Sequence, residues 1–524
     1  MTRSLTRRLA ITPRCVLPFP AMLRPVLHLS SLLVLLGGLL SVPGAAQDLR
    51  PRTVITTDGE IDDVDSFVRL LLLSNELRIQ GLVYSSSMWH FRGDGTGTTR
   101  LSEMEMTREM YGERADLRWP GESWMQEMID DYAAVYDTLR QHAPGYPLPD
   151  SLRAVVAVGN INFEGDMERP TDGSDLIRRL LLDRDTTRIY LQAWGGTNTI
   201  ARALKSIEET YRGTPAWLEV YREVCQKAVL YLIMDQDATY RDYVAKVWPD
   251  LPILFNGGQF GALAYWWKRD LPPVYQFWLG GDFMREHIIQ DHGPLTANYY
   301  SYGDGRAQPG DPEHTHGDPT LLDSSQWGRF EAYDFISEGD SPAFLHLVDV
   351  GLGNLENPAY GGWGGRLVAM DSAAVVYKDT TAAADYNPYR RRRDGGFAQA
   401  RWIPALQREM AARADWCVLP VSRANHPPVV SADSTLRTVA GGDKIVLQVT
   451  AEDPDGDTLY YHWFQYGEAD SYPGNAMLIL NKDRVTVSVP RDLETGQTIH
   501  LIAEVTDGGS PGLTRYARFV LVGE

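Results

Sequence analysis

The chain has 524 residues and a formal net charge of −19, with 50 lysines and arginines against 69 aspartates and glutamates. This length predicts two or more domains, and the balance of 44% hydrophobic and 23% charged residues excludes a mainly disordered chain. The acidic excess repels phosphate backbones, so the composition argues against a nucleic-acid polymer as a partner.

The first 46 residues have the features of an export signal. They contain five arginines and no acidic residue, and an apolar run from Leu29 to Leu40 leads into a segment of small residues. The run is too short for a stable membrane-spanning helix, and Gly44 and Ala46 match the positions that signal peptidase reads. We therefore expect cleavage after Ala46 and a secreted or periplasmic protein without a membrane span.

From Thr53 to about Trp248, short apolar segments alternate with amphipathic ones. Strands that alternate with helices form βαβ units, so this pattern predicts an α/β domain whose mostly parallel sheet is flanked by helices. Sites in such sheets lie beyond the carboxyl ends of the strands. The predicted strands are Thr53–Thr57, Gln80–Ser85, Ala154–Val158, Arg188–Ala193 and Val229–Met234. The predicted helices include Phe67–Leu71, Asp175–Leu182 and Thr199–Tyr211.

The pattern changes after a helix predicted at Ile403–Trp416 and a proline-containing linker at Asn425–Pro428. The segments that follow alternate in hydrophobicity at short spacing, which is typical of an all-β, immunoglobulin-like sandwich. We therefore expect an α/β domain over residues 47–420 and a β domain over residues 425–524. The predicted strands of the second domain are Lys444–Ala451, Thr458–Tyr466, Arg484–Val489, Thr498–Val505 and Arg515–Val522.

The densest group of acidic residues follows the first predicted strand, where five acids lie between Asp58 and Asp65. Carboxylates this close repel one another, which is costly unless a cation neutralises them. Hard oxygen ligands favour Ca²⁺ or Mg²⁺ over zinc. The alternative is that Asp62 and Asp63 only complement the dipole of a following helix.

Three motifs, spread in order over most of residues 50–370, resemble those of the nucleoside hydrolase fold. They are Asp58-Gly-Glu-Ile-Asp-Asp63, the Gly-Gly-Thr-Asn-Thr turn within Leu191–Ala201, and Glu338-Gly-Asp-Ser-Pro342. The variant residues around them, together with Asp235-Gln-Asp237, resemble a secreted bacterial family that joins such a domain to an immunoglobulin-like C-terminal domain. Some of its members are described as cellulose-binding proteins.

The resemblance implies a calcium site and assigns roles within it. Asp58, Asp63 and Asp340 match metal ligands, and Asn198 falls where a backbone carbonyl binds the metal. Asp58 would also be the base that activates a metal-bound water, and Asp62 matches a contact to sugar hydroxyls. Such a site fits attack of water on an anomeric carbon.

Two residues depart from the nucleoside hydrolase pattern. Thr56 stands where those enzymes carry their first aspartate, and Gly339 stands where several carry the histidine that protonates the leaving base. The sequence therefore keeps the metal and sugar end of the site and lacks that acid, which argues against a nucleoside as the substrate.

Other residues could complete the site. Asp235 and Asp237 follow the strand Val229–Met234 and should lie at the same sheet edge as Asp58. Either could act as a general acid with a raised pKa, or both could be further metal ligands or loop-capping residues. His90, in a loop after the second strand, and Trp194 are candidate substrate contacts.

These observations predict a secreted, Ca²⁺-dependent hydrolase of glycosyl bonds. Its substrate would be a carbohydrate such as a furanoside or a fragment of a cell-wall glycan. The alternatives are a non-catalytic carbohydrate-binding protein that retains the fold, and an N-ribohydrolase of nucleosides, which Gly339 disfavours. The sequence does not indicate an oligomeric state.

Overall fold

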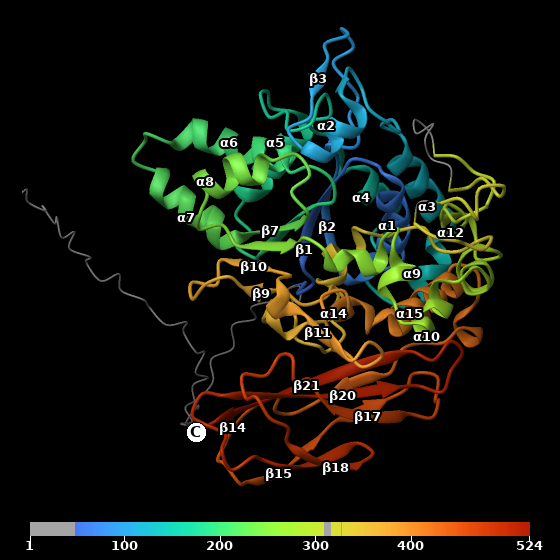
Figure 1. The fold of residues 1–524 in the computed structure, drawn as a ribbon, viewed down its shortest axis with the longest axis vertical. Helices are drawn as coiled ribbons and strands as arrows, with labels where there is room; N and C mark the ends of the chain where they lie inside the picture. The colour runs from blue at the N-terminus through green and yellow to red at the C-terminus, as the bar shows by residue number, and fades with distance from the viewer. Residues whose placement is uncertain (1–47, 309–315, 326) are drawn as a thin grey trace, which may run out of the picture. The chain divides into compact units, whose positions relative to one another are not determined.

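One mostly parallel sheet organises the first part of the chain (Figure 1). The computed structural model describes residues 48–308, 316–325 and 327–524. The strand order is β5-β2-β1-β6-β7-β8-β10-β9, and the pairing of β9 with β10 is antiparallel. The strands are β1 (Arg52–Thr57), β2 (Arg78–Tyr84), β5 (Val156–Val158), β6 (Ile189–Ala193), β7 (Ala228–Ile233), β8 (Ile253–Asn256), β9 (Val368–Ala369) and β10 (Val376–Lys378).

Helices cover both faces of this sheet (Figure 1). Successive side chains of a strand point to opposite faces, and in β1 Ile55 packs with one set of helices while Val54 packs with the other. The first set is α1 (Ile61–Leu72), α3 (Trp124–His142) and α15 (Ile403–Trp416), and the second is α5 (Asp172–Leu181), α6 (Asn198–Tyr211) and α7 (Trp217–Lys227). Burial on both faces explains why β1 is a continuous buried strand.

Short elements fill the connections. The helices among them are α2 (Glu105–Tyr111), α4 (Pro149–Arg153), α8 (Ala245–Val247), α9 (Trp267–Asp270), α10 (Pro273–Gln276), α11 (Gly281–Met284), α12 (Pro294–Ala297), α13 (Ser341–Leu345) and α14 (Phe397–Ala400). The paired strands are β3 (Arg100–Leu101) with β4 (Glu113–Arg114), and β11 (Asp385–Asn387) with β12 (Arg392–Asp394). The first pair flanks α2.

The C-terminal strands form an all-β unit, as predicted. Sheets β14-β21-β20-β17 and β15-β19-β18 enclose a common apolar core, and β13 pairs with β16. The strands are β13 (Val429–Ser431), β14 (Leu436–Val439), β15 (Lys444–Gln448), β16 (Thr450–Glu452), β17 (Tyr460–Gln465), β18 (Met477–Asn481), β19 (Arg484–Ser488), β20 (Thr498–Thr506) and β21 (Thr514–Gly523). Trp463 is buried in this core.

The β strands pack on the helical part through buried polar contacts. Arg515 pairs with Glu409 of α15 at 2.9 Å, and the Tyr466 hydroxyl donates to Asp385 at 2.6 Å. Burial would raise the pKa of Glu409, but Arg515 and Arg413 outweigh it and lower that pKa to about 2. Glu409 therefore stays ionised at neutral pH and keeps both arginines paired.

The predicted α/β fold with an all-β C-terminal part is confirmed, and the prediction for Ile403–Trp416 coincides with α15. The export signal at residues 1–46 lies outside the described residues, and the domain limits 47–420 and 425–524 stay predictions. Across the described ranges, none of the helices combines the length and the apolar character needed to cross a bilayer.

A buried ion pair fixes a late segment of the chain against α1. Arg69 contacts both carboxylate oxygens of Glu338, at 2.5 and 2.8 Å, and both side chains are almost fully buried. The hydroxyls of Tyr299 and Ser341 donate to the same carboxylate at 2.5 and 2.7 Å. Glu338 lies two residues before Asp340, so this network determines where Asp340 sits.

Removal of the arginine should destabilise the fold strongly. Arg69→Ala leaves Glu338 as an unpaired buried charge, and we expect it to lower the free energy of unfolding by about 3–5 kcal/mol. The control is Arg140→Ala, whose partner Asp137 is exposed; it should change that free energy by about 0.5 kcal/mol or less. Urea denaturation measures both, and equal losses would contradict the structural role of the pair.

Candidate functional site

The site begins where β1 ends. Asp58 follows the last residue of β1, and Gly59 turns the chain toward α1 with φ +79°. A Cβ at Gly59 would lie 2.7 Å from a side-chain carbon of Pro120 and 2.9 Å from the indole nitrogen of Trp124. Both the left-handed backbone and the close packing therefore require glycine here, and they hold Asp58 at the carboxyl edge of the sheet.

Three further carboxylates gather beside Asp58. Asp62 and Asp63 lie in the first turn of α1, and Asp340 immediately precedes α13. One carboxylate oxygen from each of these three aspartates lies within 4.8 Å of those of the other two. The chain thus brings an early motif and a residue almost 280 positions later into one acidic cluster.

The pKa values of the carboxyl groups in this cluster are shifted. Burial and repulsion between the carboxylates raise the pKa of Asp62, Asp63 and Asp340 well above the ordinary value. Burial alone would also raise the pKa of Asp58, but contacts with His90 outweigh it, and the pKa of Asp58 is lowered. Asp58 is therefore the carboxylate of this group that remains ionised most readily.

The donor set fits a hard divalent cation. The oxygens of Asp62, Asp63 and Asp340 can reach a common ion, and the buried Oδ2 of Asp58 has no hydrogen-bond partner. Carboxylate oxygens without sulfur or imidazole in the cluster favour Ca²⁺ or Mg²⁺. A cation would offset the repulsion that raises the pKa of three of these groups.

Two glycines allow the close approach of neighbouring segments to the aspartates. A Cβ at Gly195, in the turn after β6, would lie 2.7 Å from the carboxyl carbon of Asp58. A Cβ at Gly339 would lie 2.6 Å from Oδ2 of Asp62. The space that a side chain at position 339 would need is therefore taken by the Asp62 carboxylate.

A cavity of about 360 Å³ opens above the aspartates. Its lining combines carboxylates with many aromatic rings: Asp58, Glu60, Asp62, Asp63 and Asp340, with Trp89, Tyr111, Trp194, Phe260, Tyr265, Trp266 and Trp327. Flat apolar faces beside converging polar groups are the usual composition of a small-molecule site. The arrangement suits a ligand with hydroxyl groups at one end and a flat apolar face.

Other predicted residues occupy several positions around the cavity. Trp194 lines it and donates its indole N–H to Gln192 at 3.0 Å. His90 is fully buried, with Nδ1 3.6 Å from Oδ2 of Asp58, and therefore lies behind the aspartate rather than on the lining. The Asn198 amide is used internally, since it accepts from Ser85 and donates to Ser86.

Asp237 and Asp235 do not line the cavity with the aspartates, although Gln236 between them does. One oxygen of Asp237 accepts the backbone N–H of Asn198 at 2.8 Å, and the other accepts from Thr239. The structure thus uses Asp237 to hold the start of α6, which matches the loop-capping alternative better than a general acid.

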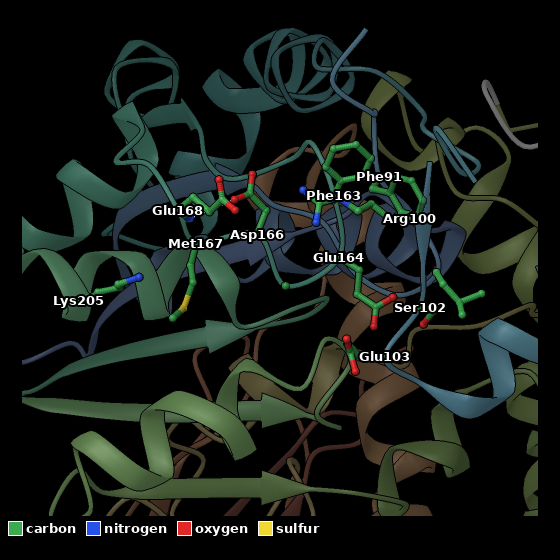
Figure 2. Close-up of a pocket in the computed structure, with 12 residues that line it drawn as sticks. Phe91, Arg100, Ser102, Glu103, Phe163, Glu164, Asp166, Met167, Glu168 and Lys205 are labelled. Atoms are coloured by element: carbon green, nitrogen blue, oxygen red, sulfur yellow. Dashed lines mark hydrogen bonds between the residues drawn. The ribbon is translucent and has the colours of Figure 1, made fainter. Parts of the chain in front are cut away.

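Another cavity, of about 220 Å³, is lined by a different set of residues (Figure 2). Glu103 and Glu164 line it, with the Arg100 guanidinium over the Phe163 ring at 5.0 Å. Burial and repulsion from Asp237 and Glu103 raise the pKa of Glu164 to about 7. Asp235 has its pKa raised to about 6, also by burial and by Asp237.

Sequence reasoning missed most of the cavity wall. Glu60 lies inside the acidic motif, and its carboxylate accepts from the Tyr265 hydroxyl at 2.9 Å. Tyr265 stacks on Trp327, and Trp89 meets Tyr111 edge to face. These rings come from the end of α2 and from separate loops, and the only signal for them was the high tryptophan and tyrosine content, 14 and 26 residues.

Fold and site together define a nucleoside hydrolase-like protein. The profile described as "Cellulose-binding Sde182, nucleoside hydrolase-like domain" matches residues 52–367, and the chain belongs to this family. Residues 444–522 match the profile "Cellulose-binding protein Sde0182, C-terminal domain". No curated protein sequence matches the chain.

Among solved structures, the chain is similar to a nucleoside hydrolase-related hypothetical protein from Saccharophagus degradans, described as associated with carbohydrate metabolism. The two share 25% identity with a TM-score of 0.66, over 91% of this chain and 100% of that one. Fragments of protocadherins GammaB4 and Gamma B2 match only 18% and 19% of this chain, at 24% and 25% identity, with TM-scores of 0.14 and 0.15.

The cluster should respond to calcium and to the loss of one carboxylate. We expect Ca²⁺ at about 100 times its Kd to stabilise the protein by about 2.7 kcal/mol. Asp340→Asn should abolish most of this gain, and it should raise stability without divalent cations by about 1 kcal/mol because it relieves repulsion. Thermal unfolding with EDTA and with added Ca²⁺ measures both effects.

The matched control is Asp282→Asn, which removes a charge from a side chain that is 91% exposed. It should leave the calcium response unchanged. A full calcium response in Asp340→Asn would show that the ion does not bind at this cluster.

Proposed function

We propose that the protein is an exported, Ca²⁺-dependent hydrolase of glycosyl bonds that acts on a carbohydrate. The observation that carries the proposal is the placement of Asp62, Asp63 and Asp340 beside Asp58 at the base of an aromatic-lined cavity. Carboxylates of this kind can hold a cation and sugar hydroxyls, while the rings can stack on a sugar face. Membership in a family described as cellulose-binding supports a carbohydrate ligand.

In this proposal the bound ion and Asp58 have different roles. Bound Ca²⁺ would supply Lewis acidity and orient the hydroxyl groups of the sugar. Asp58, whose pKa is lowered, is ionised near neutral pH, and its unpartnered Oδ2 can accept the proton of the attacking water. His90, 3.6 Å from that carboxylate, helps to lower the pKa of Asp58.

Carbohydrate binding without turnover is the second candidate, and one observation favours it. Position 339 has no side chain, and a Cβ there would lie 2.6 Å from Oδ2 of Asp62, so the chain lacks a leaving-group acid where several nucleoside hydrolases carry one. The same observation disfavours an N-ribohydrolase, the third candidate. A protein that binds sugars through this cavity would need the rings and the cation but no acid.

Loss of the proposed base should separate catalysis from binding. We expect Asp58→Asn to lower the rate of sugar release from cleaved glycosides by about 10²–10⁴-fold, because proton transfer to Asp58 is lost. A panel of pyranosides, furanosides and nucleosides, assayed with Ca²⁺ by product chromatography, measures this effect.

The control is Asp137→Asn, at a side chain that is 84% exposed, and it should keep full activity. Glycan binding without release from any glycoside would contradict the enzyme and support the binding protein. Cleavage of nucleosides alone would support the N-ribohydrolase instead.

A further inference from the structure

The two ends of the cavity above the aspartates differ in burial. Asp58, Asp63 and Asp340 are each at most 2% exposed, and they sit where β1, α1 and α13 converge. Met106 and Met110 of α2 also line the cavity, and they are 50% and 60% exposed. Among the described residues, the acidic end is therefore the more buried end of the cavity, and the methionine end is the more exposed one.

From this asymmetry we infer that the cavity takes a carbohydrate chain by its terminal sugar. The last sugar ring lies at the aspartate cluster, and the next ring or rings lie against the aromatic residues and methionines of the mouth. The cleavage of that terminal unit rests on the proposed function, whereas the end-on mode of binding does not.

The size of the cavity supports end-on binding. Its volume of about 360 Å³ is near the lower end of the range for ligand sites, and it accommodates about one or two sugar rings. A chain bound by an internal sugar would have to continue on both sides of the aspartates. Asp58, Asp63 and Asp340 are instead buried where β1, α1 and α13 converge.

The mouth matches the faces of sugar rings. Trp266 and Trp327 lie 5.6 Å apart between ring centroids, and Trp89 and Tyr111 form a second pair at 6.5 Å. The C–H face of a sugar ring packs on such surfaces, as other apolar faces do. Met110, one residue before Tyr111, extends the apolar surface outward.

The outer apolar surface also favours a chain over a single nucleoside. A glycan continues past the first stacking position and can cover Met106 and Met110. The substrate class that fits both ends is therefore an oligosaccharide with a free terminus.

Calorimetry with end-blocked oligosaccharides tests this inference on the full-length Asp58→Asn variant with Ca²⁺, so that no substrate is consumed. The probes are cellotetraose, xylotetraose and arabinotetraose at about 1 mM. For each probe that binds, one derivative carries an acetal on the non-reducing terminal sugar and another is reduced to the alditol. We expect one of these two changes to abolish binding and the other to leave the affinity within about threefold.

Substitutions at the mouth locate the bound chain. Trp266→Ala should weaken binding about tenfold through lost stacking, and Met110→Ala should weaken it about threefold. Because Met110 is largely exposed, its substitution keeps the test valid even if Trp266→Ala misfolds. The control is Tyr460→Ala on β17, because Tyr460 is 61% exposed and is not among the residues that line the cavity; this variant should bind normally.

The outcomes separate the inference from the proposed function. End-selective binding with no hydrolysis by the unsubstituted protein would refute the enzyme and sustain the inference. Hydrolysis that releases internal fragments would sustain the enzyme and refute the inference. Absence of binding by all three probes, or equal binding of both blocked derivatives, would also overturn it.

Discussion

The site depends on the buried ion pair between Arg69 and Glu338. Asp63 lies on α1, close to the beginning of the described chain, whereas Asp340 lies on a segment that belongs to no strand of the main sheet. Arg69 lies on α1 six residues beyond Asp63, and Glu338 lies two residues before Asp340. A buried charge is costly unless it stays paired, so the contact between Arg69 and Glu338 holds α1 and the segment before α13 in a fixed relative position. The geometry of the carboxylates follows from that relative position.

The fold holds several aspartates close together although their charges repel one another. Four aspartates share a small buried volume, and three of them have raised pKa values. The apolar contacts of α1 and β1 compensate for this repulsion, since Ile55 and Phe67 are fully buried in the same core. A site of this kind is ready to bind a cation because the ion removes an unfavourable interaction as well as forming new ones.

The sequence allowed the α/β scaffold and the aspartate cluster to be predicted, but not the aromatic lining of the cavity. Strand and helix periodicity located β1, α6 and α15, and the motif at Asp58 drew attention to the cluster because its residues are contiguous. For Asp237, the place after a strand left a general acid and a loop-capping residue both open, because the sequence does not reveal that backbone N–H groups occupy its oxygens. Trp89 and Trp327 reach the cavity from loops more than 200 residues apart, and no local pattern encodes such an encounter.

Gly339 has a consequence for how this family could change its chemistry. The Asp62 carboxylate already fills the direction in which a side chain at position 339 would project. A single substitution that introduced histidine there would clash with a member of the acidic cluster instead of adding an acid to it. The two positions are therefore coupled, because a side chain at position 339 requires the Asp62 carboxylate to shift.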